Sequence, residues 1–414
     1  MRQSEQRPEC RACTAPLERI FIDLGSCPLA NALLDEAALA RAERSYPLRV
    51  YVCDRCLLVQ LGAAPSPELL FSDYAYFSSY SESWVQHARE FADVAVERFR
   101  LGSSSLVLEV ASNDGYLLRH FRDRGIRVLG VDPAANIAAA AERLGITTVV
   151  AFFGRETAQR LVDSHGPASL VVANNVLAHV PALHDFVGGL QIVLGDGGVI
   201  SAEFPHILRL IEQCQFDTIY HEHVSYLSLV ALEPILEAHG LAAFDVEELP
   251  THGGSLRLYI CRADEIRPQS ARLQAVRLDE QRAGLKSVDG YIGMEERARV
   301  IRHDLHTFLL DARRSGKTTV AYGAAAKGVM LLNTSGVDSQ LVDYVVDRSP
   351  HKQGSYLPGA RLLIRPPEAV ADTRPDYLLL LPWNLKEEIV EQMSWVREFG
   401  CRFVTPIPRL EVLP

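Results

Sequence analysis

The sequence predicts an α/β protein of three parts: a zinc-binding amino-terminal domain, a central Rossmann-like doubly wound sheet, and a second Rossmann-like α/β domain at the carboxy-terminal end. Two CxxC pairs near the start predict the first part. Dense alternation of strand and helix patterns from Leu106 predicts the second, and a similar series from Lys317 predicts the third. We expect the domains to span residues 1–66, 67–262 and 263–414.

The composition is that of a globular protein with an acidic surface. The chain has 414 residues, of which 48% are hydrophobic and 23% charged, and a net charge of −10. This charge argues against a nucleic-acid-binding surface, and no apolar run is long enough for a membrane span. The opening residues also lack the apolar run of a signal peptide. We therefore expect a cytoplasmic protein without nucleic-acid or membrane partners, either a monomer or a weak oligomer.

The two CxxC pairs predict a metal site. In a reducing cytoplasm paired CxxC motifs indicate metal binding more than disulfides, and four thiolates complete a tetrahedron around zinc. A closed shell of four sulfurs leaves no open position, so the site is expected to be structural. Reduced core cysteines or a redox motif are the alternatives. The expected ligands are Cys10, Cys13, Cys53 and Cys56.

An aromatic segment separates the zinc domain from the central sheet. Residues 65–83 are dense in tyrosine, phenylalanine and serine, and apolar residues recur at helical spacing from Trp84 to Phe99. The aromatic side chains favour either packing between domains or a flap over a ligand. In the flap interpretation, Ser79 and Tyr80 reach a cofactor.

The central domain begins with a run of buried strands. A hairpin of residues 243–249 and 256–261 is expected to close the sheet, and ligands of such sheets bind beyond the carboxyl ends of the strands. The parallel strands are predicted at Leu106–Ala111, Arg127–Asp132, Thr147–Phe153, Leu170–Ala173 and Val199–Phe204.

The loop after the first of these strands indicates the kind of nucleotide. The chain has no GxGxxG and no GxxxxGK[ST] motif, so the phosphate grip of a dinucleotide or triphosphate site is missing. EVASNDG stands there instead, and Asp132 ends the next strand, where an acid suits ribose hydroxyls. This favours S-adenosylmethionine (SAM) over a degenerate dinucleotide site. The expected cofactor residues are Glu109, Ala111, Asn113, Asp114, Gly115, Asp132, Pro133, Asn174 and Asn175.

The segment FDTIYHEHVS supplies candidate acid–base groups. In extended form Tyr220 and Glu222 share one face, and His221 and His223 share the other. A neutral histidine is the commonest general base, whereas His-x-His could also chelate a metal. Such a base suits a methylation that first removes a proton from carbon next to a carbonyl.

The last third of the chain concentrates positive charge in an otherwise acidic protein. Residues 263–316 are predicted to form a charged helical arm, followed by strands and helices from Thr319 onward. Lys327, Arg348, His351 and Lys352 fall at predicted strand ends. A diphosphate suits such a cluster, and a solvated basic face is the alternative.

These motifs together resemble the three-domain sugar C-methyltransferases that make branched deoxysugars for antibiotics. The resemblance spans nearly the entire chain and rests on the CxxC pairs, LFSDYAYFSSYSESW, LEVASNDGYLL, FDTIYHEHVSYLS, THGGSLRLY, AYGAAAKGVMLLN and VDRSPHKQGSYLPG. Family members often have proline where this chain has Ala325, which puts details of nucleotide contact in question.

The resemblance implies a class I SAM-methyltransferase sheet, structural zinc, and a thymidine-diphosphate (TDP)-linked 4-keto-6-deoxysugar as substrate. It implies that His223 is the base that removes the proton next to the ketone. The methylated carbon is expected to be C-3, with C-5 as the less favoured position. The other implied reaction-site residues are Tyr220, Glu222, His179, Tyr74 and Tyr76. The implied substrate residues are Lys327, Asn333, Asp347, Arg348, Lys352, Gln353, His252 and Arg257. Rival interpretations are a zinc-containing binding protein with a vestigial fold, an oxidoreductase, and an O- or N-methyltransferase.

Overall fold

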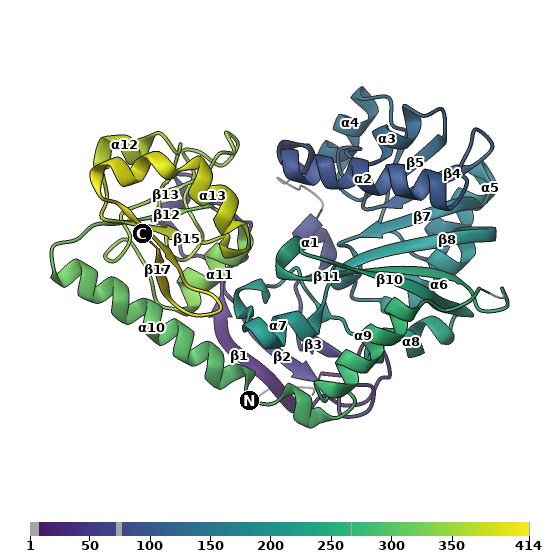
Figure 1. The fold of residues 1–414 in the computed structure, drawn as a ribbon, viewed down its shortest axis with the longest axis horizontal. Coiled ribbons are helices and arrows are strands. Elements are labelled where there is room, and N and C mark those ends of the chain that lie inside the picture. The colour runs from purple at the N-terminus through teal and green to yellow at the C-terminus, as the bar shows by residue number, and fades with distance from the viewer. Residues whose placement is uncertain (1–7, 72–76, 266, 414) are drawn as a thin grey trace.

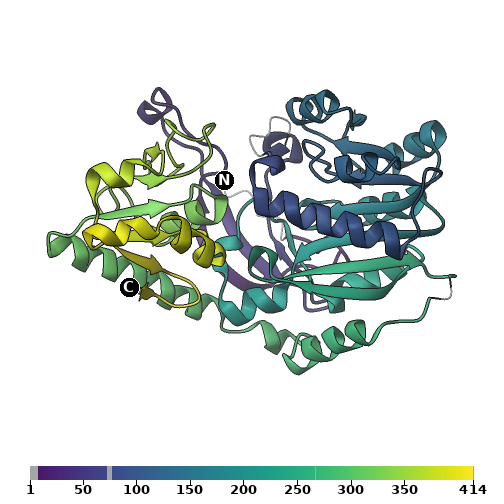
Figure 2. The same cartoon turned by 45° about the horizontal axis from the view of Figure 1, so that its top comes forward.

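The computed structural model describes residues 8–71, 77–265 and 267–413. Three sheets correspond to the three predicted parts, and Figures 1 and 2 show the central and carboxy-terminal domains side by side, with the zinc domain's strands between them. Among the described residues, no helix combines the length and apolar character needed to cross a membrane.

The first sheet is antiparallel and takes its last strand from far along the chain. Its order is β1-β2-β3-β9, so a short strand from the central part of the sequence completes the zinc domain. The bounds are β1 (Arg19–Cys27), β2 (Tyr46–Val52), β3 (Val59–Leu61) and β9 (Ser225–Tyr226).

The central sheet has seven strands in the order β10-β11-β8-β7-β4-β5-β6. The predicted hairpin is confirmed: β10 and β11 pair antiparallel, and β11 joins the parallel strands by pairing antiparallel with β8. The bounds are β4 (Leu106–Val110), β5 (Arg127–Asp132), β6 (Thr148–Val150), β7 (Ala168–Asn174), β8 (Leu194–Pro205), β10 (Leu241–Leu249) and β11 (Ser255–Arg262).

Helices cover both faces of this sheet because its strands are apolar on both sides. Val107 faces a core that includes Phe91 and Phe121, whereas Leu106 and Leu108 face the core of Leu161 and Phe186. On the first face lie α2 (Glu82–Arg98), α3 (Leu118–Arg122) and α4 (Ala135–Arg143). On the second lie α5 (Arg155–His165), α6 (Leu183–Val193), α8 (Leu229–Glu237) and α9 (Ala271–Arg282).

The carboxy-terminal domain is a second α/β sandwich, as predicted. Its six-stranded sheet has the order β14-β13-β12-β15-β16-β17, and only β17 pairs antiparallel. The strands are β12 (Thr319–Tyr322), β13 (Val345–Val346), β14 (Ile364–Arg365), β15 (Tyr377–Leu380), β16 (Arg402–Thr405) and β17 (Glu411–Leu413). Its helices are α10 (Met294–Arg314), α11 (Ala326–Thr334), α12 (Ala369–Thr373) and α13 (Lys386–Gln392).

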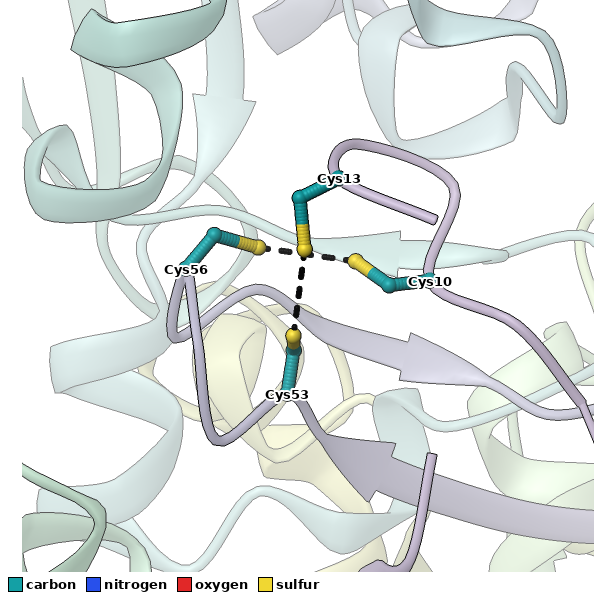
Figure 3. A group of neighbouring side chains, drawn as sticks. All are labelled: Cys10, Cys13, Cys53 and Cys56. Carbon is teal, nitrogen blue, oxygen red and sulfur yellow. Dashed lines mark hydrogen bonds between the residues drawn. The ribbon is translucent and has the colours of Figure 1, made fainter. Parts of the chain in front are cut away.

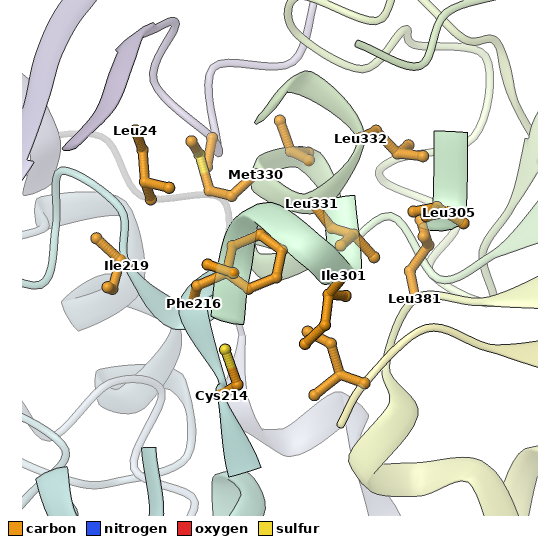
Figure 4. Close-up of a cluster of buried hydrophobic side chains, with 14 of the residues drawn as sticks. Leu24, Cys214, Phe216, Ile219, Ile301, Leu305, Met330, Leu331, Leu332 and Leu381 are labelled. Atoms are coloured by element: carbon orange, nitrogen blue, oxygen red, sulfur yellow. The ribbon is translucent and has the colours of Figure 1, made fainter. Parts of the chain in front are cut away.

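One hydrophobic core joins all three domains. Figure 4 shows Leu24 of β1, Phe216 and Ile219 of the segment before His223, and Met330 and Leu331 of α11 in a single cluster. The cluster continues into α10 and into α7 (Ile207–Gln213). Because protein interiors are close-packed, this core fixes the segment that leads to His223 against α11.

Candidate active site and zinc centre

The four cysteines of the CxxC pairs converge on one point. Their Sγ atoms all lie within 4.8 Å of one another, and Figure 3 shows the four side chains turned inward from two knuckle-like loops. Tetrahedral zinc at about 2.3 Å from each sulfur sets sulfur–sulfur separations of about 3.8 Å, so the cluster fits this metal. The Gln60 amide donates to Cys10 at 3.1 Å, and the hydrogen bonds from neighbouring groups lower the pKa of Cys10 against the raising effect of burial. The thiolate is the form that binds zinc.

The zinc knuckle is tied to the segment that carries His223. Arg11, between two zinc ligands, is half-buried, and its guanidinium donates to the carbonyl oxygens of Leu61, at 2.5 Å, and Val224, at 3.4 Å. β3 pairs with β9, and the amide of Leu61 donates to the carbonyl of Val224. The residue after His223 is therefore held by the zinc domain.

A single cavity of about 610 Å³ lies where the three domains meet. Asn31 of the zinc domain, the loops at the carboxyl ends of the central strands, and the loops of the carboxy-terminal domain all line it. The predicted residues that line it are Ala111, Asn113, Asp132, Pro133, Asn174, Asn175, His179, Tyr220, His223, His252, Lys327 and Lys352. The sequence thus identified residues from distant segments that the fold brings to one cavity.

The cofactor end of the cavity is built by the loop after β4. Ala111 and Asn113 have φ values of 55° and 49°, which turn the chain sharply. Asp132 accepts hydrogen bonds from the amides of Asn113, at 3.0 Å, and Ala134, at 2.9 Å. Within the described chain, side-chain polar atoms of Asn174 and Asn175 are buried without partners. A ligand with ribose hydroxyls and amine groups would satisfy them, so this end fits SAM.

Five predicted cofactor residues do not line the cavity. Glu109 lies beneath the loop, where burial, with smaller effects from Asp114 and Asp132, raises its pKa well above the usual value. Gly115 has a φ of 77° and lies against Ile146, so the turn requires it. The carboxylate of Asp114 accepts the amide of Ser79, and Tyr80 reaches His351 at 2.9 Å. These residues shape the loop and bridge to the carboxy-terminal domain.

The reaction end of the cavity is lined by three histidines, His179, His223 and His252. Nδ1 of His223 lies 2.8 Å from the carbonyl of Thr218; since a carbonyl only accepts, Nδ1 carries the proton and Nε2 keeps its lone pair. The Tyr220 hydroxyl donates to this Nε2 at 2.9 Å. Burial lowers the pKa of His223 well below its usual value and lowers that of His179 to about 4 and of His252 to about 4. All three imidazoles are therefore neutral at neutral pH.

The segment around His223 is turned, which corrects the extended form expected from the sequence. The amide of His223 donates to the carbonyl of Tyr220, so these two side chains meet on one side. Glu222 points elsewhere: its carboxylate accepts from Asn31 at 2.6 Å and does not line the cavity. His221 donates to the carbonyl of Tyr46. Among the described residues, the histidine pair forms no metal cluster.

Five predicted substrate residues lie outside the cavity lining, each with another partner. Arg257 is buried in an ion pair with Glu203 at 2.8 Å. Asn333 donates to the carbonyl of Pro358 at 3.0 Å. Asp347 accepts the amides of Ala324 and Ser349, both at 2.8 Å, and its own carbonyl accepts from Gln353. Arg348 is exposed and lies 3.4 Å from Gln392. Tyr74 and Tyr76 lie outside the described residues.

Some cavity residues escaped the sequence analysis. Asn31, Trp84, Thr218 and Phe71 line the cavity, and Phe71 packs edge-on against His179 at 5.6 Å between ring centres. Asn31 lies in a loop without any motif. Trp84 was assigned to a helix face by its spacing, which gives no indication that the helix begins at the cavity.

Comparison with known proteins is consistent with this geometry. Three family models match in succession: a zinc binding domain over residues 10–71, a methyltransferase domain over 84–246, and a C-methyltransferase C-terminal domain over 250–408. The C-methyltransferase NovU of Streptomyces niveus is 38% identical over 98% of this chain and 96% of its own. The chain belongs to the C-methyltransferase family.

Two other proteins are similar to only part of this C-methyltransferase. A ubiquinone biosynthesis O-methyltransferase of Bradyrhizobium sp. (strain ORS 278) is 27% identical over 31% of this chain and 59% of its own. The solved structure of a 1,6-didemethyltoxoflavin-N1-methyltransferase of Burkholderia thailandensis is 17% identical, with a TM-score of 0.37, over 52% of this chain and 98% of its own.

The family assignment selects transfer to carbon among the alternatives that the sequence left open. The C-methyltransferase uses SAM as its methyl donor, and its four-cysteine cluster holds a structural zinc ion. SAM supplies an electrophilic methyl group when bound. The residues at the carboxyl ends of β4 and β5, Asp132 among them, would hold it.

Proposed function

We propose that this C-methyltransferase acts on a TDP-linked 4-keto-6-deoxysugar in deoxysugar biosynthesis for antibiotics. In this proposal the enzyme removes the proton from the carbon next to the ketone, at C-3, and the methyl group is transferred to that carbon. C-5, on the other side of the ketone, is the alternative position. One observation carries the proposal: a neutral imidazole, His223, lines a cavity that also contains the cofactor end and two lysines.

His223 is suited to accept a proton from carbon. Its Nδ1–H is bound to the backbone, which fixes the ring and directs Nε2 toward the Tyr220 hydroxyl. A positioned general base typically contributes 10²–10⁴-fold to a rate, an order-of-magnitude range. Tyr220 can shift its hydroxyl hydrogen bond from the imidazole to the substrate once the base is protonated. His179, with its ring 4.8 Å from that of His223, borders the same space.

Positive charge at the opposite rim of the cavity supports a diphosphate-linked substrate. Lys352 and His351 both line the cavity, and Lys352 lies beside the carbonyl of Ala324 in the loop before α11. In an acidic protein, such a rim concentrates the phosphate end of a sugar nucleotide. The sugar would then extend inward toward His252 and His223.

Product analysis tests the proposal. The enzyme is incubated with SAM and a panel of TDP-linked 4-keto-6-deoxysugars that carry an amino or a hydroxyl group at C-3. We expect a methylated product whose NMR spectrum shows a new carbon–carbon bond at C-3. A methyl group at C-5 would redirect the proposal to the other carbon. Methylation on oxygen or nitrogen, or no methylation of any 4-ketosugar, would refute it.

A further inference from the structure

Lys327 is a half-buried lysine that lines the cavity. It lies in the first turn of α11 and lines the cavity together with His223 and His252. Its ammonium donates to the side-chain oxygen of Asn384 and lies 5.3 Å from the centre of the Trp383 ring. The rim lysine differs in its partner: Lys352 pairs with the carboxylate of Asp347 at 3.8 Å, whereas Lys327 donates to the neutral amide of Asn384.

Hydrogen-bonded side chains surround the ammonium of Lys327. The indole nitrogen of Trp383 donates to Asp217 at 2.7 Å, and Asp217 is fully buried one turn before Tyr220. Burial lowers the pKa of Lys327, and the charge of Asp217 raises it again. The apolar side of α11 packs in the shared core with Phe216, directly before Asp217 (Figure 4). Lys327 and the segment that carries the base therefore form one packed unit.

The proposed reaction is favoured by a hydrogen-bond donor at the ketone oxygen. Removing a proton next to a ketone leaves negative charge on the ketone oxygen, and a depressed pKa makes His223 a weak base on its own. A preorganised donor at the oxygen that becomes negative lowers this barrier. Burial, with a smaller effect from the charge of Lys327, lowers the pKa of both His223 and His252, and all three side chains line the same cavity.

We propose that Lys327 is a catalytic residue: it donates a hydrogen bond to the ketone oxygen of the substrate and stabilises the enolate, with Asp217 and Trp383 as its positioning residues. This inference rests on the proposed function. The lone pair of His223 Nε2 takes the proton, the C–H electron pair becomes the carbon–carbon double bond, and the carbonyl π pair moves to the oxygen. When the carbon forms its bond to the methyl group, the methyl–sulfur bond of SAM breaks with its electrons staying on sulfur, and the carbonyl is restored.

The assignment differs from a diphosphate contact in a measurable way. In D₂O with S-adenosylhomocysteine in place of SAM, proton removal is followed alone, as loss of the NMR signal at the carbon next to the ketone. We expect Lys327→Met to slow this exchange about 10²–10³-fold, the usual effect of a lost oxyanion donor. We expect its Kd for TDP, measured by calorimetry, to change by less than about threefold, since a rim cation binds the phosphates.

Matched lysine variants provide the controls. Lys352→Met should weaken TDP binding at least about tenfold, the loss of one charge-assisted contact. The exposed Lys286→Met should change neither TDP binding nor exchange. Unchanged affinity for S-adenosylhomocysteine and full zinc content show that Lys327→Met is folded, and Lys327→Arg, which keeps the charge, should recover part of the exchange rate.

The outcomes separate the two proposals. Wild-type exchange in Lys327→Met, or loss of TDP affinity with exchange intact at saturation, overturns the role of Lys327 and leaves the proposed function standing. A wild-type enzyme that exchanges no proton next to the ketone overturns the proposed function, and the role of Lys327 with it.

The positioning role of Asp217 has its own readout. Asp217→Asn removes the charge that keeps Lys327 protonated, so the alkaline limb of the exchange profile should move to lower pH. An alkaline limb at the wild-type pH would remove Asp217 from the proposal.

Discussion

Replacing His223 by asparagine isolates proton acceptance from the other roles of the side chain. The Asn amide nitrogen can occupy the place of Nδ1 and keep the hydrogen bond to the carbonyl of Thr218, which is 2.8 Å long in the native protein. It has no basic nitrogen in the place of Nε2. The Tyr220 hydroxyl loses its acceptor, at a cost of about 1 kcal/mol in stability. Folding should therefore be nearly intact, and the change falls on the chemical step.

The expected loss follows from the role of the base. A general base contributes about 10²–10⁴-fold, which corresponds to about 2.7–5.5 kcal/mol of activation free energy. The assay is single-turnover methyl transfer with saturating SAM and ketosugar, with melting temperature measured in parallel. His221→Asn is the matched control, because His221 is the buried neighbour that bonds to Tyr46 and does not line the cavity. A His223→Asn enzyme that keeps more than about a tenth of the wild-type rate would refute the assignment of the base.

Four further outcomes follow from the same structure. Stability should fall as pH drops below about 6.5 toward 4, because the unfolded chain takes up protons that the neutral imidazoles of His179 and His252 do not bind in the folded state; a melting temperature constant over that range would contradict the lowered pKa values. Because the pKa of His223 is lowered, the acid limb of the kcat/KM profile should lie below about pH 6.5, and an acid limb at higher pH would show that a different group titrates. Asp132→Ala should weaken SAM binding by at least about tenfold in calorimetry without loss of zinc, and unchanged affinity would move the ribose site elsewhere. Cys53→Ser should lower both zinc content and melting temperature; a fully stable, zinc-free variant would show that the metal does not support the fold.

The parts of the site that the sequence predicted are those where chemistry dictates position. Paired CxxC motifs can meet only around a common centre, and Asp132 ends a buried strand, so its carboxylate must lie at the sheet's carboxyl edge. His223 was predicted from its residue type and the family resemblance, and the fold places it in the cavity.

The parts that could not be predicted depend on tertiary contacts. The predicted placement of the YHEH side chains on alternating faces depended on an extended chain. In the structure, the amide of His223 donates a hydrogen bond to the carbonyl of Tyr220, so the chain turns and these two side chains meet. The resemblance implied Arg257 as a substrate residue, but the fold pairs it with Glu203 on the neighbouring strand. Asn31 belongs to no sequence motif. It lines the cavity only because the fold brings its loop there.

The pairing of β3 with β9 has a consequence for protein engineering. Ser225 and Tyr226 belong by sequence to the central domain, yet they complete the sheet of the amino-terminal lobe two residues after the proposed base. A chimera that exchanges this lobe with that of another enzyme would create a mismatched edge beside residue 223. A chimera should therefore exchange β3 and β9 together, because the boundary between the two domains passes beside the proposed base and does not coincide with the domain boundaries along the sequence.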